Sequence, residues 1–444
     1  MSQSSPNAAG TDTADKPSWR AALAVYLEPA SLRMLALGFS AGLPLLLVFG
    51  TLSFWLREAG VNRATIGFIS WVTLMYAFKW CWAPLVDRLP IPGLTAMFGR
   101  RRSWLLLSQL GIVIGVIGMA FSDPKVAVMP IVWFALLVAF SSATQDIALD
   151  AFRIESGDKD RQAALSATYQ TGYRLALIWA GAGVLWIAAR AEVATPEKYD
   201  VNAWQTAYLV MAASMLVGIV TVLLSKEPAH AAIVRAKNIA EWFQSALIDP
   251  FADFFKRYGW HAALVLALIA TYRISDIVMG IMANPFYVDM GYTKNEVASI
   301  AKVYGVIMTL VGAFLGGVLS MKFGVMRVLM LGAILSAASN LLFAWLTTRG
   351  HDVTALTFVI SLDNLSAGIA STAFIAYMSS LTNISYSATQ YALLSSMMLL
   401  LPKWIAGFSG VAVNSVGYAS FFVGTALLGV PVLVLIWLAS RRLS

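Results

Sequence analysis

Long apolar stretches separated by short polar loops are the feature that most constrains how this 444-residue chain can fold. A bilayer core is about 30 Å thick, and a helix needs roughly 20 apolar residues to cross it. Since lipid offers the backbone no hydrogen-bonding partners, each stretch must be helical. We expect twelve spanning helices, near residues 32–56, 64–86, 103–121, 127–150, 163–189, 204–224, 261–284, 295–320, 326–347, 354–379, 386–412 and 418–440.

The composition agrees with a membrane protein. The chain is 59% hydrophobic and only 12% charged, whereas about 25% of residues are charged in soluble domains. The net charge of +8 is spread between the apolar stretches, which favours contact with anionic lipid over a nucleic-acid partner. Cys81 is the only cysteine and the three histidines are scattered, so we expect no disulfide, metal or cofactor.

One long polar connection divides the chain. Residues 1–30 are polar and lack the pattern of a signal peptide, so they are expected to be a disordered cytosolic tail. Residues 225–260 carry an amphipathic pattern, which predicts a cytoplasmic linker with a surface helix near 233–248. The linker separates two six-helix bundles, 31–224 and 261–444.

The basic residues of the loops predict the orientation. With the amino terminus inside, the cytoplasmic segments hold nineteen Lys and Arg and the outer segments hold seven. Lys and Arg accumulate in cytoplasmic loops. Both termini are therefore expected in the cytoplasm.

A weak internal repeat supports the division into halves. The segment REAGVNRATI at 57–66 matches VDMGYTKNEV at 288–297, with a shift of 231 residues. Similarly, SATYQ at 166–170 matches SATQY at 387–391. Duplicated halves around a midplane site are a common transporter architecture.

Several motifs resemble known transporters. The loop from PLVDR at 84–88 to GRRR at 99–102 resembles the signature loop of the major facilitator superfamily. Further motifs make the chain similar to AmpG-type muropeptide permeases: FKWCWAPLVDR (78–88), GRRRSWLLLSQL (99–110), SSATQDIALDAFR (141–153), YRISD (272–276) and SYSATQYALLSS (385–396). One departure is Pro402-Lys403, where the family usually has Gly-Arg.

The resemblance implies a fold and a function. The fold would be a twelve-helix, all-α major facilitator protein of the bacterial inner membrane. The function would be proton-driven import of anhydro-muropeptides from periplasm to cytoplasm, which makes protons and an anionic sugar-peptide the partners. The signature loop implies a cytoplasmic gate, for which we expect Asp87, Arg88, Arg100, Arg101, Arg102, Asp150 and Arg153.

Polar residues inside the predicted spans are the candidates for substrate binding, because such residues are expensive in lipid and commonly mark a pathway. Lys79, Arg174 and Lys403 suit the carboxylates of a muropeptide. Gln145, Gln170 and Asn364 suit its sugar amides and hydroxyls, and Tyr76, Tyr169 and Tyr173 suit its sugar faces. The alternative is that these groups only pair across helices.

Acids in the spans are candidates for proton coupling. Asp146 and Asp150 lie four residues apart on one helix face, with Asp146 deeper in the bilayer. We predict that Asp146 carries the proton, with Asp276 as second candidate. Arg273 and Asp276 can pair within their helix, Lys302 could also pair with Asp276, and Asp363 is expected to pair within the membrane.

Other interpretations stay open. An intramembrane hydrolase would need a catalytic His set or paired acids, and no His lies deep in a span, so we expect no enzyme. A sensor without transport, or a permease for another bulky anion such as a siderophore complex or a coenzyme A ester, is compatible with the sequence. A monomer is expected. The glycine spacings at Gly38 and Gly42 and at Gly312 and Gly316 predict close helix packing.

Overall fold

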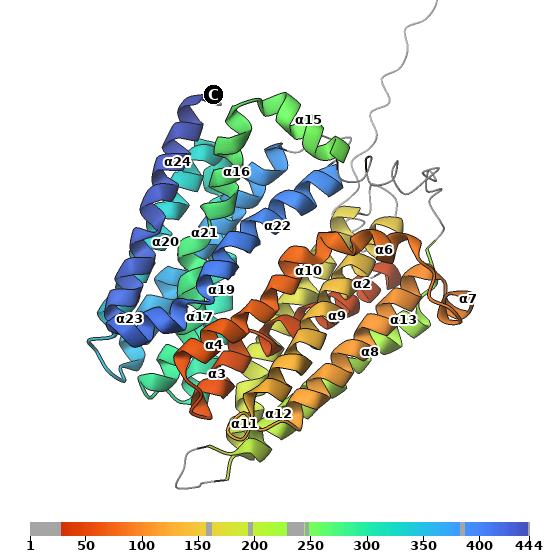
Figure 1. The fold of residues 1–444 in the computed structure, drawn as a ribbon, viewed down its shortest axis with the longest axis horizontal. Helices are drawn as coiled ribbons and strands as arrows, with labels where there is room; N and C mark the ends of the chain where they lie inside the picture. Colours follow the sequence, from red (N-terminus) through yellow and green to blue (C-terminus); the bar gives the residue numbers. More distant parts are fainter. Residues whose placement is uncertain are drawn as a thin grey trace, which may run out of the picture.

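The computed structural model describes residues 28–156, 162–193, 199–228, 244, 248–381 and 387–442. These residues are helical, contain no strand, and form two bundles that lie side by side (Figure 1). The predicted all-α fold is confirmed. The predicted tail at 1–30 and surface helix near 233–248 fall almost entirely outside the described residues.

The amino-terminal bundle begins with a helix in two pieces and continues with a strongly broken one. Its elements are α2 (Pro29–Leu47), α3 (Gly50–Glu58), α4 (Arg63–Ile69), η2 (Ser70–Leu74), α5 (Met75–Phe78), η3 (Lys79–Cys81), α6 (Ala83–Arg88), α7 (Leu94–Phe98), α8 (Arg100–Ala120), α9 (Val128–Glu155), α10 (Gln162–Ile178), η4 (Trp179–Gly183), α11 (Val184–Ala191), α12 (Val201–Ser214) and α13 (Leu216–Leu224). Of these, η4 is a π-helical turn inside the fifth predicted span.

The carboxy-terminal bundle follows a short helix of the linker, α15 (Asp249–Tyr258). Its elements are α16 (His261–Thr271), α17 (Ile274–Asp289), α18 (Lys294–Glu296), η6 (Val297–Tyr304), α19 (Gly305–Phe323), α20 (Val325–Leu346), α21 (Val353–Leu381), α22 (Ser387–Ala406), α23 (Ser409–Leu427) and α24 (Gly429–Arg442). Here η6 is a second π-helical segment, in the eighth predicted span.

Ten helical stretches among the described residues are long and apolar enough to cross a membrane. Two predicted spans are not among them. The 3-10 turns η2 and η3 divide the span 64–86 into short pieces, and within the described part of 386–412 the apolar helix is the shorter stretch Leu393–Ala406. At the end of the chain, Ser409–Arg441 forms one stretch. Gly417 interrupts it with a φ of 78°, which glycine adopts without strain, so the chain changes direction where the sequence predicts that one span ends and the next begins.

The two bundles contact each other differently at their two ends. We call the end that carries residues 59–62 and 290–293 the latch end, and the opposite end, where α15 and Arg442 lie, the linker end (Figure 1). Contacts between the bundles join α3 to α17, α4 to α23 and η4 to η6, and α22 to η2, α5 and η3. The first three pairs lie toward the latch end, and α22 adds a second line of contact along the broken span.

Glycines let two pairs of helices approach closely. A Cβ added to Gly38 of α2 would lie 2.2 Å from the carbonyl oxygen of Tyr169, and one added to Gly172 of α10 would lie 1.9 Å from that of Leu35. In the other bundle, a Cβ on Gly312 would lie 2.2 Å from the Leu365 carbonyl oxygen. The close packing predicted from the glycine spacings is confirmed.

We predict that Gly172→Ala destabilises the protein by about 1–3 kcal/mol, because the methyl group would collide with the α2 backbone, which cannot move aside as a side chain can. Gly280→Ala is the matched control, since a Cβ there meets nothing within 4 Å. Thermal unfolding in detergent, followed by tryptophan fluorescence, measures both. Equal melting temperatures for the two variants would contradict the packing argument.

Candidate functional site

Asp146 lies at the centre of a polar group in the amino-terminal bundle. It stands on α9, within electrostatic reach of Lys79 on η3 and of Asp150. Tyr169 and Tyr173 of α10 face the same carboxylate, and their ring centroids are 6.2 Å apart. The buried Oδ1 atom of Asp146 accepts no hydrogen bond from any described residue. The structure therefore brings four predicted site residues around one acid.

Lys403 extends this group across the two bundles. From α22 its Nζ atom donates to the carbonyl oxygen of Thr73 at 2.9 Å and lies 5.3 Å from the centroid of the Tyr76 ring. Lys79 lies close enough to act on it electrostatically. Two cations from different bundles thus share one region with Asp146.

The other predicted residues of the amino-terminal bundle are placed differently. Arg174 lies near Tyr173, and Gln170 is exposed. Gln145 has no exposed surface, and its Oε1 accepts only a long contact of 3.5 Å from the hydroxyl of Ser40. In this conformation, Gln145 belongs to the bundle interior.

The acids of the carboxy-terminal bundle have partners of their own. Asp276 forms an ion pair with Arg273 at 3.5 Å, one turn away on the same helix, and accepts from the Ser336 hydroxyl. Asp363 accepts from the Ser339 hydroxyl at 2.9 Å and lies within electrostatic reach of Asp276. The predicted pairing of Arg273 with Asp276 is observed.

Two predicted residues of this bundle bond to neutral groups. Asn364 donates to the Ile360 carbonyl oxygen at 3.0 Å and accepts from Thr309 at 3.0 Å, which joins α21 to α19. Lys302 donates to the Oδ1 atom of Asn284 at 2.7 Å. The suggested partner Asp276 is instead engaged with Arg273.

The basic cluster at the linker end binds within its own bundle. Arg101 pairs with Glu155 at 2.7 Å and Arg100 lies 3.9 Å from the same carboxylate. Arg102 donates to two carbonyl oxygens at the end of α13, and Arg153 pairs with Asp150 at 3.5 Å. The side chains of Asp87 and Arg88 fall outside the described part of the chain. The gating roles stay a prediction.

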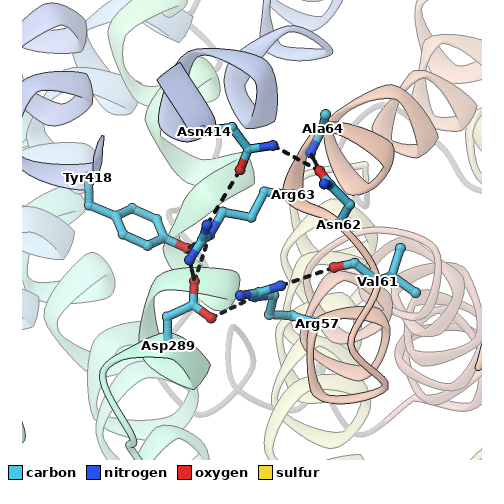
Figure 2. Close-up of polar contacts among 8 residues, drawn as sticks. All are labelled: Arg57, Val61, Asn62, Arg63, Ala64, Asp289, Asn414 and Tyr418. Atoms are coloured by element: carbon cyan, nitrogen blue, oxygen red, sulfur yellow. Dashed lines mark hydrogen bonds and ion pairs between the residues drawn. The ribbon is translucent and has the colours of Figure 1, made fainter. Parts of the chain in front are cut away.

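Sequence reasoning missed the polar cluster at the latch end, which is centred on Asp289 (Figure 2). Arg57 and Arg63 reach this carboxylate from the other bundle at 2.6 and 2.7 Å, and the Tyr418 hydroxyl donates to it at 2.6 Å. Beside them, Asn414 donates to the side chain of Asn62 at 2.8 Å. These contacts can form only when the latch ends of the two bundles meet.

A second cross-bundle ion pair lies at the same end. Lys294 of the carboxy-terminal bundle binds Glu58 at 2.6 Å and Glu192 at 3.0 Å. The Trp204 indole donates to the other oxygen of Glu58 at 2.6 Å. Only 6% of the Lys294 side chain is exposed. The charge-assisted bonds are thus sheltered from solvent, where they contribute more than at a surface.

The two ion pairs are related by the internal repeat. The shift of 231 residues that aligns the loops carries Glu58 onto Asp289 and Arg63 onto Lys294. Each acid binds the base of the opposite bundle. The internal repeat is therefore the sequence signal that could identify these ion pairs: the acid of each copy is the partner of the base in the other copy.

Comparisons with known proteins give the family. The chain is 35% identical over 412 residues to "Putative transporter AmpG 4" of Rickettsia felis, covering 92% of this chain and 96% of that protein. It is 32% identical over 423 residues to the "Anhydromuropeptide permease" of Escherichia coli K12, covering 95% and 82%. Residues 32–181 match the family model described as "Acetyl-coenzyme A transporter 1".

Solved transporters share the fold at low identity. A POT family transporter in complex with a conjugated peptide superposes with a TM-score of 0.68 at 11% identity, covering 93% of this chain and 96% of that one. A bacterial homologue of the lysosomal transporter Spinster gives 0.64 at 16%, covering 93% and 98%. The chain therefore belongs to the AmpG family of permeases, and it is a multi-pass inner-membrane transporter with the major facilitator fold.

Proposed function

We propose that this protein is a monomeric symporter that imports anhydro-muropeptides from periplasm to cytoplasm together with protons. The Escherichia coli relative is an anhydromuropeptide permease by name, which supports the substrate. The observation that carries the proposal is the meeting of Lys403 from one bundle with Tyr76 and Lys79 from the other, where Lys79 also acts on Asp146. This region combines the cations, aromatic rings and titratable acid that an anionic sugar-peptide and a coupled proton require.

The bundles support a conformation that faces the cytoplasm. The Asp289 side chain at the latch end is 14% exposed, whereas that of Asp150 near the linker end is 52% exposed. With both termini in the cytoplasm, as the basic loops predict, the latch end faces the periplasm and is closed. Substrate would then leave toward the linker end, past Gln170 and Arg174.

A coenzyme A ester is the second candidate substrate. The family model that matches residues 32–181 is described as an acetyl-coenzyme A transporter, and such an ester also presents anionic groups to fixed cations. Because that match covers only part of the amino-terminal bundle, we rank the muropeptide first.

We predict that this chain restores uptake of labelled anhydro-muropeptide to bacteria that lack their own muropeptide permease. Acetyl-coenzyme A in excess should leave that uptake unchanged. Lys403→Gln should raise the KM about tenfold, since a charge-assisted bond to a substrate carboxylate contributes roughly 1.5–3 kcal/mol. Exclusive uptake of acetyl-coenzyme A would instead favour the second candidate.

We predict that Asp146→Asn abolishes proton-driven accumulation while exchange of substrate down its own gradient continues. Asparagine keeps the size and hydrogen bonding of the acid but cannot carry a proton. Uptake into vesicles with and without an imposed pH gradient measures the two activities. Asp253→Asn, on the linker helix α15, is the control. Accumulation at the wild-type level by Asp146→Asn would move the assignment to Asp276.

We predict that Asp289→Asn opens the latch end more often, because Arg57 and Arg63 lose their shared anion. A cysteine replacing Asn414, in a chain carrying Cys81→Ser, should then react faster with a membrane-impermeant maleimide added outside. Asp123→Asn is the matched control, since the Asp123 side chain bonds only within the amino-terminal bundle, to Tyr199 and the backbone of Lys125. Unchanged labelling would show that Asp289 does not hold this end shut.

A further inference from the structure

Lys302 lies in a membrane-spanning segment and takes part neither in the ion pairs of the latch end nor in the polar group around Asp146. Its ammonium donates to the neutral side chain of Asn284. The described residues place no charged partner beside it, and its side chain is partly buried. By contrast, Arg273 has Asp276 beside it and Lys79 has Asp146. An ammonium without an anion is costly in a membrane-spanning segment and is a mark of function.

The backbone of the opposite bundle lies against this partly buried lysine. A Cβ added to Gly50 of α3 would lie 3.2 Å from Asn284 Nδ2 and 3.8 Å from Lys302 Nζ. One added to Gly181 of η4 would lie 3.4 Å from Lys302 Cδ. Two glycines of the amino-terminal bundle thus leave just enough room for the Lys302–Asn284 pair at the seam between the bundles.

This seam lies on the latch side of the molecule, where α3 meets α17 and η4 meets η6. Opening of the latch end would move Gly50 and Gly181 away with their bundle and expose the ammonium further. Asn284 accepts from Lys302 through its oxygen, so its amide nitrogen is available to donate to an incoming anion. Lys302 also stands in a π-helical segment, and such segments occur frequently at functional sites.

We propose that Lys302 and Asn284 form a capture subsite for a carboxylate of the substrate, open when the latch end is open and covered in the present conformation. The inference rests on the proposed function, and the carboxylate is that of the muropeptide peptide. Closure of the seam over Lys302 displaces the anion, which then passes to Lys403 and Lys79. The subsite therefore acts on substrate that arrives from the latch side.

The test compares Lys302→Gln, Lys302→Arg and Lys322→Gln in cells that take up labelled anhydro-muropeptide. Lys322 is the matched control, because it is exposed at the far end of the same span. We expect Lys302→Gln to raise the KM at least about tenfold, Lys302→Arg to stay within about threefold of wild type, and Lys322→Gln to be unchanged. Equal expression and equal melting temperatures exclude misfolding.

A substrate with amidated peptide carboxylates separates binding from structure. Wild type should bind it more weakly than the free acid, and Lys302→Gln should cause no further loss. A wild-type KM in Lys302→Gln, or the same proportional loss with the amidated substrate, would overturn the capture subsite and leave the proposed function intact. Failure of the wild-type chain to take up muropeptide would instead remove the proposed function, and this inference with it.

Discussion

Two reciprocal ion pairs between the bundles are the interaction on which the rest of the structure depends. Arg63 reaches over to Asp289, and Lys294 reaches back to Glu58. Because these residues are equivalent in the repeat, the chain closes one end with two copies of the same contact, related by its pseudo-symmetry. Apolar helix faces alone would not favour one relative position so strongly, since lipid is as apolar as leucine and hydrophobic burial drives little association in a membrane.

The ion pairs at the latch end also determine which cations between the bundles are accessible. Closing that end covers Lys302 with the glycines of the opposite bundle and brings Lys403 to Thr73 and Tyr76. Under the proposed function, opening would break both sets of contacts together, because α17, α22 and η6, which carry them, belong to one bundle. Under the proposed function, a ligand that bridges Lys79 and Lys403 would replace bonds lost at the latch, which is how differential affinity shifts a two-state equilibrium.

The sequence predicted the helices well, because apolar length alone decides whether a segment crosses a bilayer. It predicted partners poorly. Gln145 and Asn364 have the chemistry of sugar-binding groups, yet one is buried beside Ser40 and the other joins α21 to α19. The ion pair between Arg57 and Asp289 joins residues far apart in sequence, and no local periodicity reports such a contact. The broken span at 64–86 was also missed, since its 3-10 turns carry no proline or glycine signal inside the helical pattern.

The candidate acids differ in a way that bears on coupling. Asp276 already has a guanidinium and a hydroxyl beside it. Asp363 has a hydroxyl donor and another acid nearby. Asp146 combines an oxygen without a donor among the described residues with a lysine, Lys79, within electrostatic reach, and Lys79 in turn acts on Lys403. Under the proposed function, a substrate carboxylate would compete with Asp146 for the Lys79 ammonium, so substrate binding and proton loading would favour each other at this one acid.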